Sequence, residues 1–524
     1  MSAPTTPEPI GPGVASAAVT IGIGNVTSRL LGLVREQVIA ALFGSTGPTS
    51  AFRTATRVST AVYDLLLSGA TTSALVPVFS DYAAAGKNQE LSRIVSTFIN
   101  LTVVGLGAVV AALVLGAPWL VSVLGADPDY FNLAVDLTRI ALPSVLLLGI
   151  TGILSSVLYA RQAFRVPAFA PAVYNLGIIV AAILLAGPLS IYGLTLGLAF
   201  GALVQVLVQL PAFRGLRYMP VIDLGHPGVR LVLRLYTPVF LGMLASYAVV
   251  VIDTNLAWRT GAESVADLAF ATTLVQFPIG LVGAAASLAI LPSLSRLAAS
   301  GRAEDEAAFV ATLISGLKMV LLLMVPLAVA LVVVREPLVA LLFERRAFDA
   351  AATARTSLAL LAYAPQLPFV VVDQLLIVAF YARKETTTPV LVGVGGAALY
   401  LAVALSLITP MGMPGLALAN AVQNSAHAVV LYALLARRYP RLRDPELAGF
   451  AVRLIVGGIV VAIAVAVVAS LLDGLLADPR ELPRLLGLLL AAVTAAVVYG
   501  ACLALLRVRE AEDLLVRLGW RRAR

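Results

Sequence analysis

Apolar stretches long enough to span a bilayer recur from one end of this chain to the other. About 20 apolar residues in a helix cross a hydrocarbon core about 30 Å thick. Charged residues make up 12% of the 524 residues, roughly half of the share of about 25% that soluble domains carry. We therefore predict an all-α integral membrane protein without a separate soluble domain.

Turn-forming residues divide the chain into about fourteen predicted transmembrane helices. The clearest breaks are Gly- and Pro-containing segments, such as residues 44–48, 125–128 and 409–412. The predicted helices cover residues 15–43, 51–78, 92–123, 130–160, 167–187, 190–213, 229–257, 264–294, 306–334, 352–381, 387–408, 414–436, 449–473 and 482–507.

Basic residues concentrate in alternate loops and in the C-terminal tail. The richer loops contain Lys87, Arg93, Arg161, Arg165, Arg214, Arg217, Arg230, Arg234, Arg296, Arg302, Arg383, Lys384, Arg437, Arg438, Arg441 and Arg443. The other loops have exceptions at Arg259, Arg335, Arg345, Arg346, Arg480 and Arg484. The positive-inside rule then places both termini in the cytoplasm of a bacterial inner-membrane protein, which requires an even number of spans.

Three pairs of similar segments indicate an internal repeat. Residues 74–87 resemble residues 289–302, Tyr-Ala-Arg at 159–161 recurs at 381–383, and Gly-Leu-Thr-Leu at 193–196 resembles Gly-Leu-Ala-Leu at 415–418. Each pair is six predicted helices apart, so the copies run in the same direction, and two like-oriented lobes with a cavity between them are expected. We predict a disordered cytoplasmic tail at 1–14, an N-lobe at 15–218, a C-lobe at 219–440, and a terminal helix pair with a basic tail at 441–524.

Several other classes of function are disfavoured. The net charge of +8 is spread over loops rather than clustered on a polar domain, so we expect no nucleic-acid partner. Cys502 is the single cysteine, and His226 and His427 are the only histidines, so we expect no metal site and no cofactor.

Charged side chains within the first two predicted helices carry the functional hypothesis. A charge at the bilayer centre costs about 2.5–3.5 kcal/mol and normally faces a cavity or a partner. Arginine suits bidentate recognition of phosphate and carboxylate. We therefore predict a polar cleft in the first lobe and a substrate site formed by Ser28, Arg29, Arg35, Glu36, Arg53, Arg57 and Asp64.

Internal ion pairing is the alternative for the same residues. Positions seven apart share a helical face, so Arg29 could pair with Glu36, and Arg57 with Asp64. In the second lobe, Asp253 is the strongest candidate for a cation or proton site. The amides of 420–424 and the His427 imidazole are more typical of contacts between helices than of ligand binding.

Four motifs stand out, namely Thr-Ser-Arg-Leu-Leu-Gly-Leu-Val-Arg-Glu at 27–36, Leu-Val-Pro-Val-Phe at 75–79, Leu-Phe-Glu-Arg at 342–345 and Phe-Tyr-Ala-Arg at 380–383. Together they resemble the MurJ/MviN family, the lipid II flippase branch of the multidrug/oligosaccharidyl-lipid/polysaccharide exporters. The resemblance implies fourteen helices, a groove for a polyprenyl tail beside the last two, and transport of an undecaprenyl-pyrophosphate-linked glycan, lipid II or similar, for peptidoglycan synthesis. It assigns Ser28, Arg29 and Arg35 to the pyrophosphate, and cell-wall synthesis proteins to the partners.

The sequence departs from the family pattern at positions that matter for binding. Two arginines expected by resemblance are Tyr63 and Thr273 here. The sodium site of some members would use Asp253, but its partner positions are Tyr400 and Ala404.

Three competing hypotheses remain beside the flippase. One is a cation-coupled drug or solute antiporter that uses Asp253 and Lys318. Another is a non-transporting paralogue that scaffolds envelope assembly. A membrane-embedded transferase is the weakest, because the sequence has no acidic metal motif, catalytic dyad or phosphate loop. The flippase is the favoured hypothesis, with membrane lipids as its surroundings and no enzymatic activity.

Overall fold

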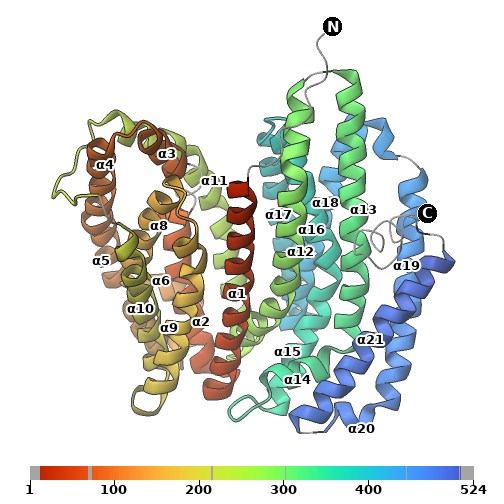
Figure 1. The fold of residues 1–524 in the computed structure, drawn as a ribbon. Coiled ribbons are helices and arrows are strands. Elements are labelled where there is room, and N and C mark those ends of the chain that lie inside the picture. Colours follow the sequence, from red (N-terminus) through yellow and green to blue (C-terminus); the bar gives the residue numbers. More distant parts are fainter. Residues whose placement is uncertain are drawn as a thin grey trace. The chain divides into compact units, whose positions relative to one another are not determined.

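Helices account for the secondary structure throughout the described part of the chain (Figure 1). The computed structural model describes residues 12–68, 74–213, 216–300, 302–443, 445–478, 480–506 and 508. The chain divides into two compact units, Met1–Ala266 and Asp267–Arg524.

The first unit contains α1 to α11. Their bounds are α1 Pro12–Phe43, α2 Gly47–Tyr63, α3 Val76–Ala84, α4 Asn88–Leu101, α5 Gly107–Leu115, α6 Ala117–Val123, α7 Phe131–Ala141, α8 Ser144–Ala160, α9 Arg165–Leu189, α10 Ile191–Gln209 and α11 Pro227–Trp258. π-helical turns at Asp64–Ser68 and Thr102–Leu106 extend α2 and join α4 to α5.

The second unit contains nearly all of α12 and the helices that follow. Their bounds are α12 Ser264–Ser300, α13 Ala303–Val333, α14 Arg335–Phe343, α15 Ala350–Tyr363, α16 Leu367–Ala382, α17 Thr387–Met411, α18 Met413–Arg438, α19 Pro445–Leu471, α20 Asp473–Leu476 and α21 Glu481–Leu505. The short helices α14 and α20 fall where the sequence predicted loops or helix ends.

Ten helical stretches among the described residues are long and apolar enough to cross a membrane. Their outward faces are apolar as well: Ile459 and Ile463 of α19 and Val497 of α21 are more than half exposed. Exposed apolar surface of this extent marks a membrane or partner contact rather than a surface in water. The predicted all-α membrane fold is confirmed, and the count of fourteen spans stays a prediction.

Contacts assign α11 to the first unit, whereas the sequence placed residues 219–440 in a second lobe; the predicted lobe bounds stay a prediction. Of the predicted tail, residues 1–11 lie outside the described residues and residues 12–14 begin α1. The basic C-terminal tail also lies outside them, apart from Val508.

Two of the predicted repeat pairs adopt matching conformations within their own units. α9 and α17 end at Ser190 and Gly412, whose φ angles are 51° and 62°. In both connections an amide three residues later donates to the carbonyl of that residue over 3.1 Å. The Tyr-Ala-Arg segments end α8 and α16, and the residues that follow them, Gln162 and Lys384, have φ angles of 59° and 60°.

The turn between α1 and α2 sets the register of the charged residues. Gly44 leaves α1 with a φ of 64°, a left-handed conformation that glycine adopts without steric cost. The Thr46 hydroxyl accepts the Thr49 amide at 3.5 Å and so caps α2, in which Pro48 lies in the first turn. This short connection brings Arg53 of α2 within reach of Glu36 of α1.

Candidate functional site

A buried carboxylate on α1 gathers two arginines. The Glu36 side chain is 3% exposed. Arg35 donates to its Oε1 through Nη2 at 2.8 Å and Nε at 3.2 Å. Arg53 of α2 donates to Oε1 through Nη1 at 3.3 Å and makes a second, short contact between Nη2 and Oε2. Two guanidiniums against one carboxylate leave one excess positive charge.

An amide on α9 completes this network. Asn175 Oδ1 accepts from Arg35 Nη1 at 2.9 Å, and its Nδ2 donates to the Ser28 carbonyl at 3.1 Å. α1 and α9 pack extensively against each other. A guanidinium has five N–H donors, and three from Arg35 are used in these contacts. The other two can serve a ligand.

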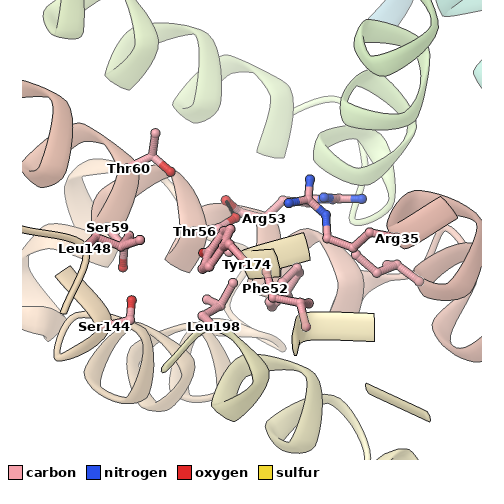
Figure 2. A pocket seen from close by; sticks show the side chains of 12 residues that line it. Arg35, Phe52, Arg53, Thr56, Ser59, Thr60, Ser144, Leu148, Tyr174 and Leu198 are labelled. Carbon is pink, nitrogen blue, oxygen red and sulfur yellow. Dashed lines mark hydrogen bonds between the residues drawn. The ribbon is translucent and has the colours of Figure 1, made fainter. Parts of the chain in front are cut away.

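A cavity of about 200 Å³ lies beside the arginines. Figure 2 shows the guanidinium ends of Arg35 and Arg53 together on one side, with the hydroxyls of Ser59, Thr60 and Ser144 on the other. The complete lining is Arg35, Ile39, Phe52, Arg53, Thr56, Ser59, Thr60, Ser144, Leu148, Tyr174, Ile178 and Leu198, drawn from α1, α2, α8, α9 and α10.

The cavity is chemically two-sided. Aliphatic and aromatic side chains such as Ile39 and Phe52 keep the dielectric low, which strengthens any charge interaction inside. The Ser59 and Ser144 hydroxyls donate to the backbone carbonyls of Ala55 and Ala141, at 3.2 and 2.6 Å. Their oxygens therefore face the cavity mainly as acceptors, and the arginines supply the cationic donors.

Of the predicted site residues, Arg35 and Arg53 line the cavity, and Glu36 holds both of them in place. Ser28 contributes through its backbone carbonyl. The Arg29 side chain is half-buried farther towards the start of α1.

The other predicted charges form a second cluster between α2 and α11. Arg57 Nη1 donates to Thr254 Oγ1 at 2.5 Å and to Asp253 Oδ2 at 3.2 Å. Asp64 Oδ2 accepts from the Tyr247 hydroxyl at 2.5 Å. The Arg57–Asp64 pair considered from the sequence is therefore not formed, and both partners contact α11 instead.

These contacts bear on the sodium site that the resemblance suggested. Asp253 is ion-paired with Arg57, and the positions of the other ligands are a buried Tyr400 and a buried Ala404. Neither residue brings a carboxylate or an amide, the oxygen ligands a hard cation needs. The cation site at Asp253 stays a prediction. Among the described residues, no three or more His, Cys, Asp or Glu side chains gather closely enough to hold a metal ion.

Sequence reasoning missed several residues that line the cavity or bond to its arginines. Asn175 and Tyr174 lie in an otherwise apolar predicted helix, 167–187, and a polar residue in such a helix was the available signal. Thr56 and Ser144 carried no such signal, because hydroxyls are common in membrane helices as backbone-bonded groups. At the two departures from the family pattern, Tyr63 packs beside an apolar cluster and Thr273 donates to the Ala269 carbonyl at 3.0 Å.

Comparisons with known proteins agree with this architecture. A solved structure described as lipid II flippase MurJ in an inward closed conformation superposes with a TM-score of 0.75 at 22% identity, over 93% of this chain and 99% of the other. An inward-facing multidrug resistance MATE transporter of the MOP superfamily superposes with a TM-score of 0.69 at 14% identity, over 79% of this chain and 95% of the other. Both show the fold.

Sequence relatives add the family. A protein of Burkholderia cenocepacia named lipid II flippase MurJ is 30% identical over 85% of this chain and 88% of its own length. A Vibrio cholerae protein named probable lipid II flippase MurJ is also 30% identical, over 85% and 87%. The family described as lipid II flippase MurJ matches residues 39–485. The chain therefore belongs to the lipid II flippase MurJ family of membrane proteins.

Proposed function

We propose that this chain is a flippase that carries a lipid-linked glycan precursor of the lipid II type across the bacterial cytoplasmic membrane for peptidoglycan synthesis. One observation carries the proposal: the guanidinium groups of Arg35 and Arg53 line a cavity in a membrane-spanning unit and share one buried carboxylate, Glu36. Family membership supplies the substrate class.

The chemistry of the substrate explains why arginine is used. A pyrophosphate is a multivalent anion whose oxygens match the planar fork of a guanidinium. Glu36 holds both guanidinium groups in one orientation before the ligand binds, so little side-chain entropy is lost on binding. Because the carboxylate neutralises only one of the two charges, the attraction to an anion persists.

The route of transport follows from the repeated architecture. Transporters built from like-oriented halves expose their site alternately to each side of the membrane. In this scheme the pyrophosphate of the substrate occupies the cavity while its polyprenyl tail stays in lipid. The basic loops place both termini in the cytoplasm, and cell-wall synthesis proteins are the proposed partners.

The antiporter hypothesis has less support. It required Asp253 as a titrating or cation-binding group, and Arg57 engages that carboxylate. The scaffold hypothesis rested on the absence of family arginines at Tyr63 and Thr273. Arg35 and Arg53 lining a cavity provide cationic donors without them.

Complementation tests the proposal. Bacteria depleted of their own lipid II flippase should grow when they express this chain, and Arg35→Ala should abolish growth at equal membrane abundance. Arg139→Ala is the matched control, because Arg139 forms an exposed pair with Asp136 at 3.7 Å and should be dispensable. Failure of the wild-type chain, or full activity of Arg35→Ala, would overturn the proposal.

A further inference from the structure

The second unit contains a carboxylate–imidazole pair that the proposed function does not use. His427 of α18 lies with Nδ1 2.6 Å from Asp373 Oδ1 of α16. Its Nε2 lies 3.3 Å from the Pro389 carbonyl oxygen in the first turn of α17. The side chains are 14% and 18% exposed. Three helices therefore meet at one imidazole ring.

The contacts of this ring determine how many protons the pair must hold. A backbone carbonyl only accepts hydrogen bonds, so Nε2 must carry a hydrogen to bond Pro389. An ionised carboxylate also only accepts. Nδ1 therefore either carries a second hydrogen, beside ionised Asp373, or accepts one from protonated Asp373. In both arrangements the pair holds one proton more than a neutral imidazole and a carboxylate would hold together.

The other histidine of the chain provides an internal contrast. His226 Nε2 lies 2.7 Å from Glu90 Oε2, while its Nδ1 accepts the Gly228 amide at 3.1 Å. A nitrogen that accepts a hydrogen bond carries no hydrogen, so this ring is satisfied as a neutral imidazole that donates to Glu90. The nitrogen that faces away from the carboxylate therefore accepts a hydrogen bond in His226 and must donate one in His427.

The position of the pair favours retention of this proton. Both residues lie in the interiors of helices, with His427 about 16 Å from the C-terminal end of α18 at a rise of about 1.5 Å per residue. Asp373 belongs to a stretch long and apolar enough to span a membrane. Proton loss would convert a pair with no net charge into a net negative one, which the low-dielectric interior of a membrane protein opposes.

Titratable groups on the neighbouring helices have contacts of their own. α13, α15 and α17 pack against α16 or α18. Glu385, just before α17, pairs with Arg438 at 2.7 Å, Arg355 of α15 pairs with Asp267 at 2.8 Å, and Lys318 of α13 lies over the Phe450 ring. The other titratable or charged groups on these helices are Glu304, Asp305, Glu306, Tyr363, Tyr381, Tyr400, Tyr432 and Arg437.

We propose that Asp373 and His427 form a proton-binding site within the second unit, held by contacts from α16, α17 and α18. The ligand is a proton shared between Asp373 Oδ1 and His427 Nδ1. Its release requires the ring to leave the Asp373 or the Pro389 contact. The site is independent of which substrate the protein carries.

Nitrogen NMR of the histidine rings tests the proposal directly, because the chain contains only two histidines. The full-length protein is labelled with ring-¹⁵N histidine, placed in nanodiscs and titrated, with His226→Gln to assign the signals. At neutral pH we expect His226 Nδ1 to be unprotonated. His427 should show a hydrogen on both nitrogens, or an Nδ1 hydrogen-bonded to a protonated carboxyl group.

Asp373→Asn should lower the proton affinity of the His427 ring at least tenfold. Glu90→Gln, the matched change at the other histidine, should leave the His427 ring signals unchanged. The proposal is overturned if wild-type His427 carries a hydrogen on only one ring nitrogen at neutral pH and the carboxyl spectrum shows no protonated group that Asp373→Asn removes. The ring-nitrogen spectrum of the wild-type protein tests the proposal even if the variant does not fold.

Discussion

Replacing Arg53 by alanine separates the proposed anion binding by the arginine cluster from its stabilisation of a buried carboxylate. Arg53 contacts both oxygens of Glu36, and the two side chains are 11% and 3% exposed. Removing one partner of a buried ion pair costs about 3–5 kcal/mol. Because Arg35 still donates twice to Glu36, we expect the lower end, about 3 kcal/mol less stability.

The effect on binding has a different size. A hydrogen bond to a charged group contributes about 1.5–3 kcal/mol, and each 1.4 kcal/mol is about tenfold in affinity. Loss of Arg53 should therefore weaken binding of a pyrophosphate lipid about 10- to 150-fold. The excess charge at the cavity also falls from one to zero. Arg53→Lys keeps the charge but not the planar fork, and should give an intermediate loss.

A double variant distinguishes the two effects. In Glu36→Gln/Arg53→Ala no carboxylate is left with a missing partner, so the melting temperature in detergent should recover relative to Arg53→Ala. Arg35 then supplies one net positive charge again, so lipid affinity should recover in part but stay below wild type, because the donors of Arg53 are absent. Stability is followed by thermal unfolding, and affinity by titration of the purified protein in nanodiscs with a fluorescent lipid II analogue. The explanation is refuted if Arg53→Ala binds the analogue as tightly as wild type, or if the double variant regains the full affinity of wild type.

Two further predictions concern the fold and a surface pair. Gly193→Ala would place a Cβ 2.6 Å from the Leu185 carbonyl oxygen, so it should lower the free energy of unfolding by about 1–3 kcal/mol. Gly187→Ala is the control, because its Cβ meets open space and should leave stability unchanged. Thermal unfolding compares the two variants. In the loop before α21, hydrogen bonds from Arg480 lower the pKa of Asp478 to about 2. The ion pair between these residues is therefore intact above the ordinary carboxyl pKa of 3.8, and it is lost as the pH falls towards 2. A ¹³C NMR titration should show that Arg480→Ala returns the pKa towards 3.8, and an unchanged pKa would contradict this assignment.

The sequence predicted the helical architecture because its signals are local. Apolar length and turn residues determine where a membrane helix begins and ends, and the observed ends of α8, α9, α16 and α17 fall near the predicted ones. The repeat was visible for the same reason, since each copy has its own turn residues. The π-helical turns and the short helices α14 and α20 depend on packing and were not predicted.

The residues around the cavity were predicted in part, and their role as a substrate site stays a prediction. Arg35 and Arg53 were recognised because a charge in an apolar helix requires a cavity or a partner. Their contact partners were not predicted, because residue spacing along a helix shows only which residues share a face of that helix. Glu36 bonds its neighbour Arg35 and reaches Arg53 on the next helix, and Asn175 comes from a helix about 140 residues later in the chain. Such contacts arise from tertiary packing.

Photocrosslinking from within the cavity tests the central claim most directly. A photoreactive amino acid at Thr56, which lines the cavity, is compared with one at Val104, which is 62% exposed on the outer surface. We predict that lipid II crosslinks through its head group at position 56, that inorganic pyrophosphate and Arg35→Ala both suppress this product, and that neither affects crosslinking at position 104. Absence of the head-group product at position 56, with lipid II captured only at position 104, would contradict the account.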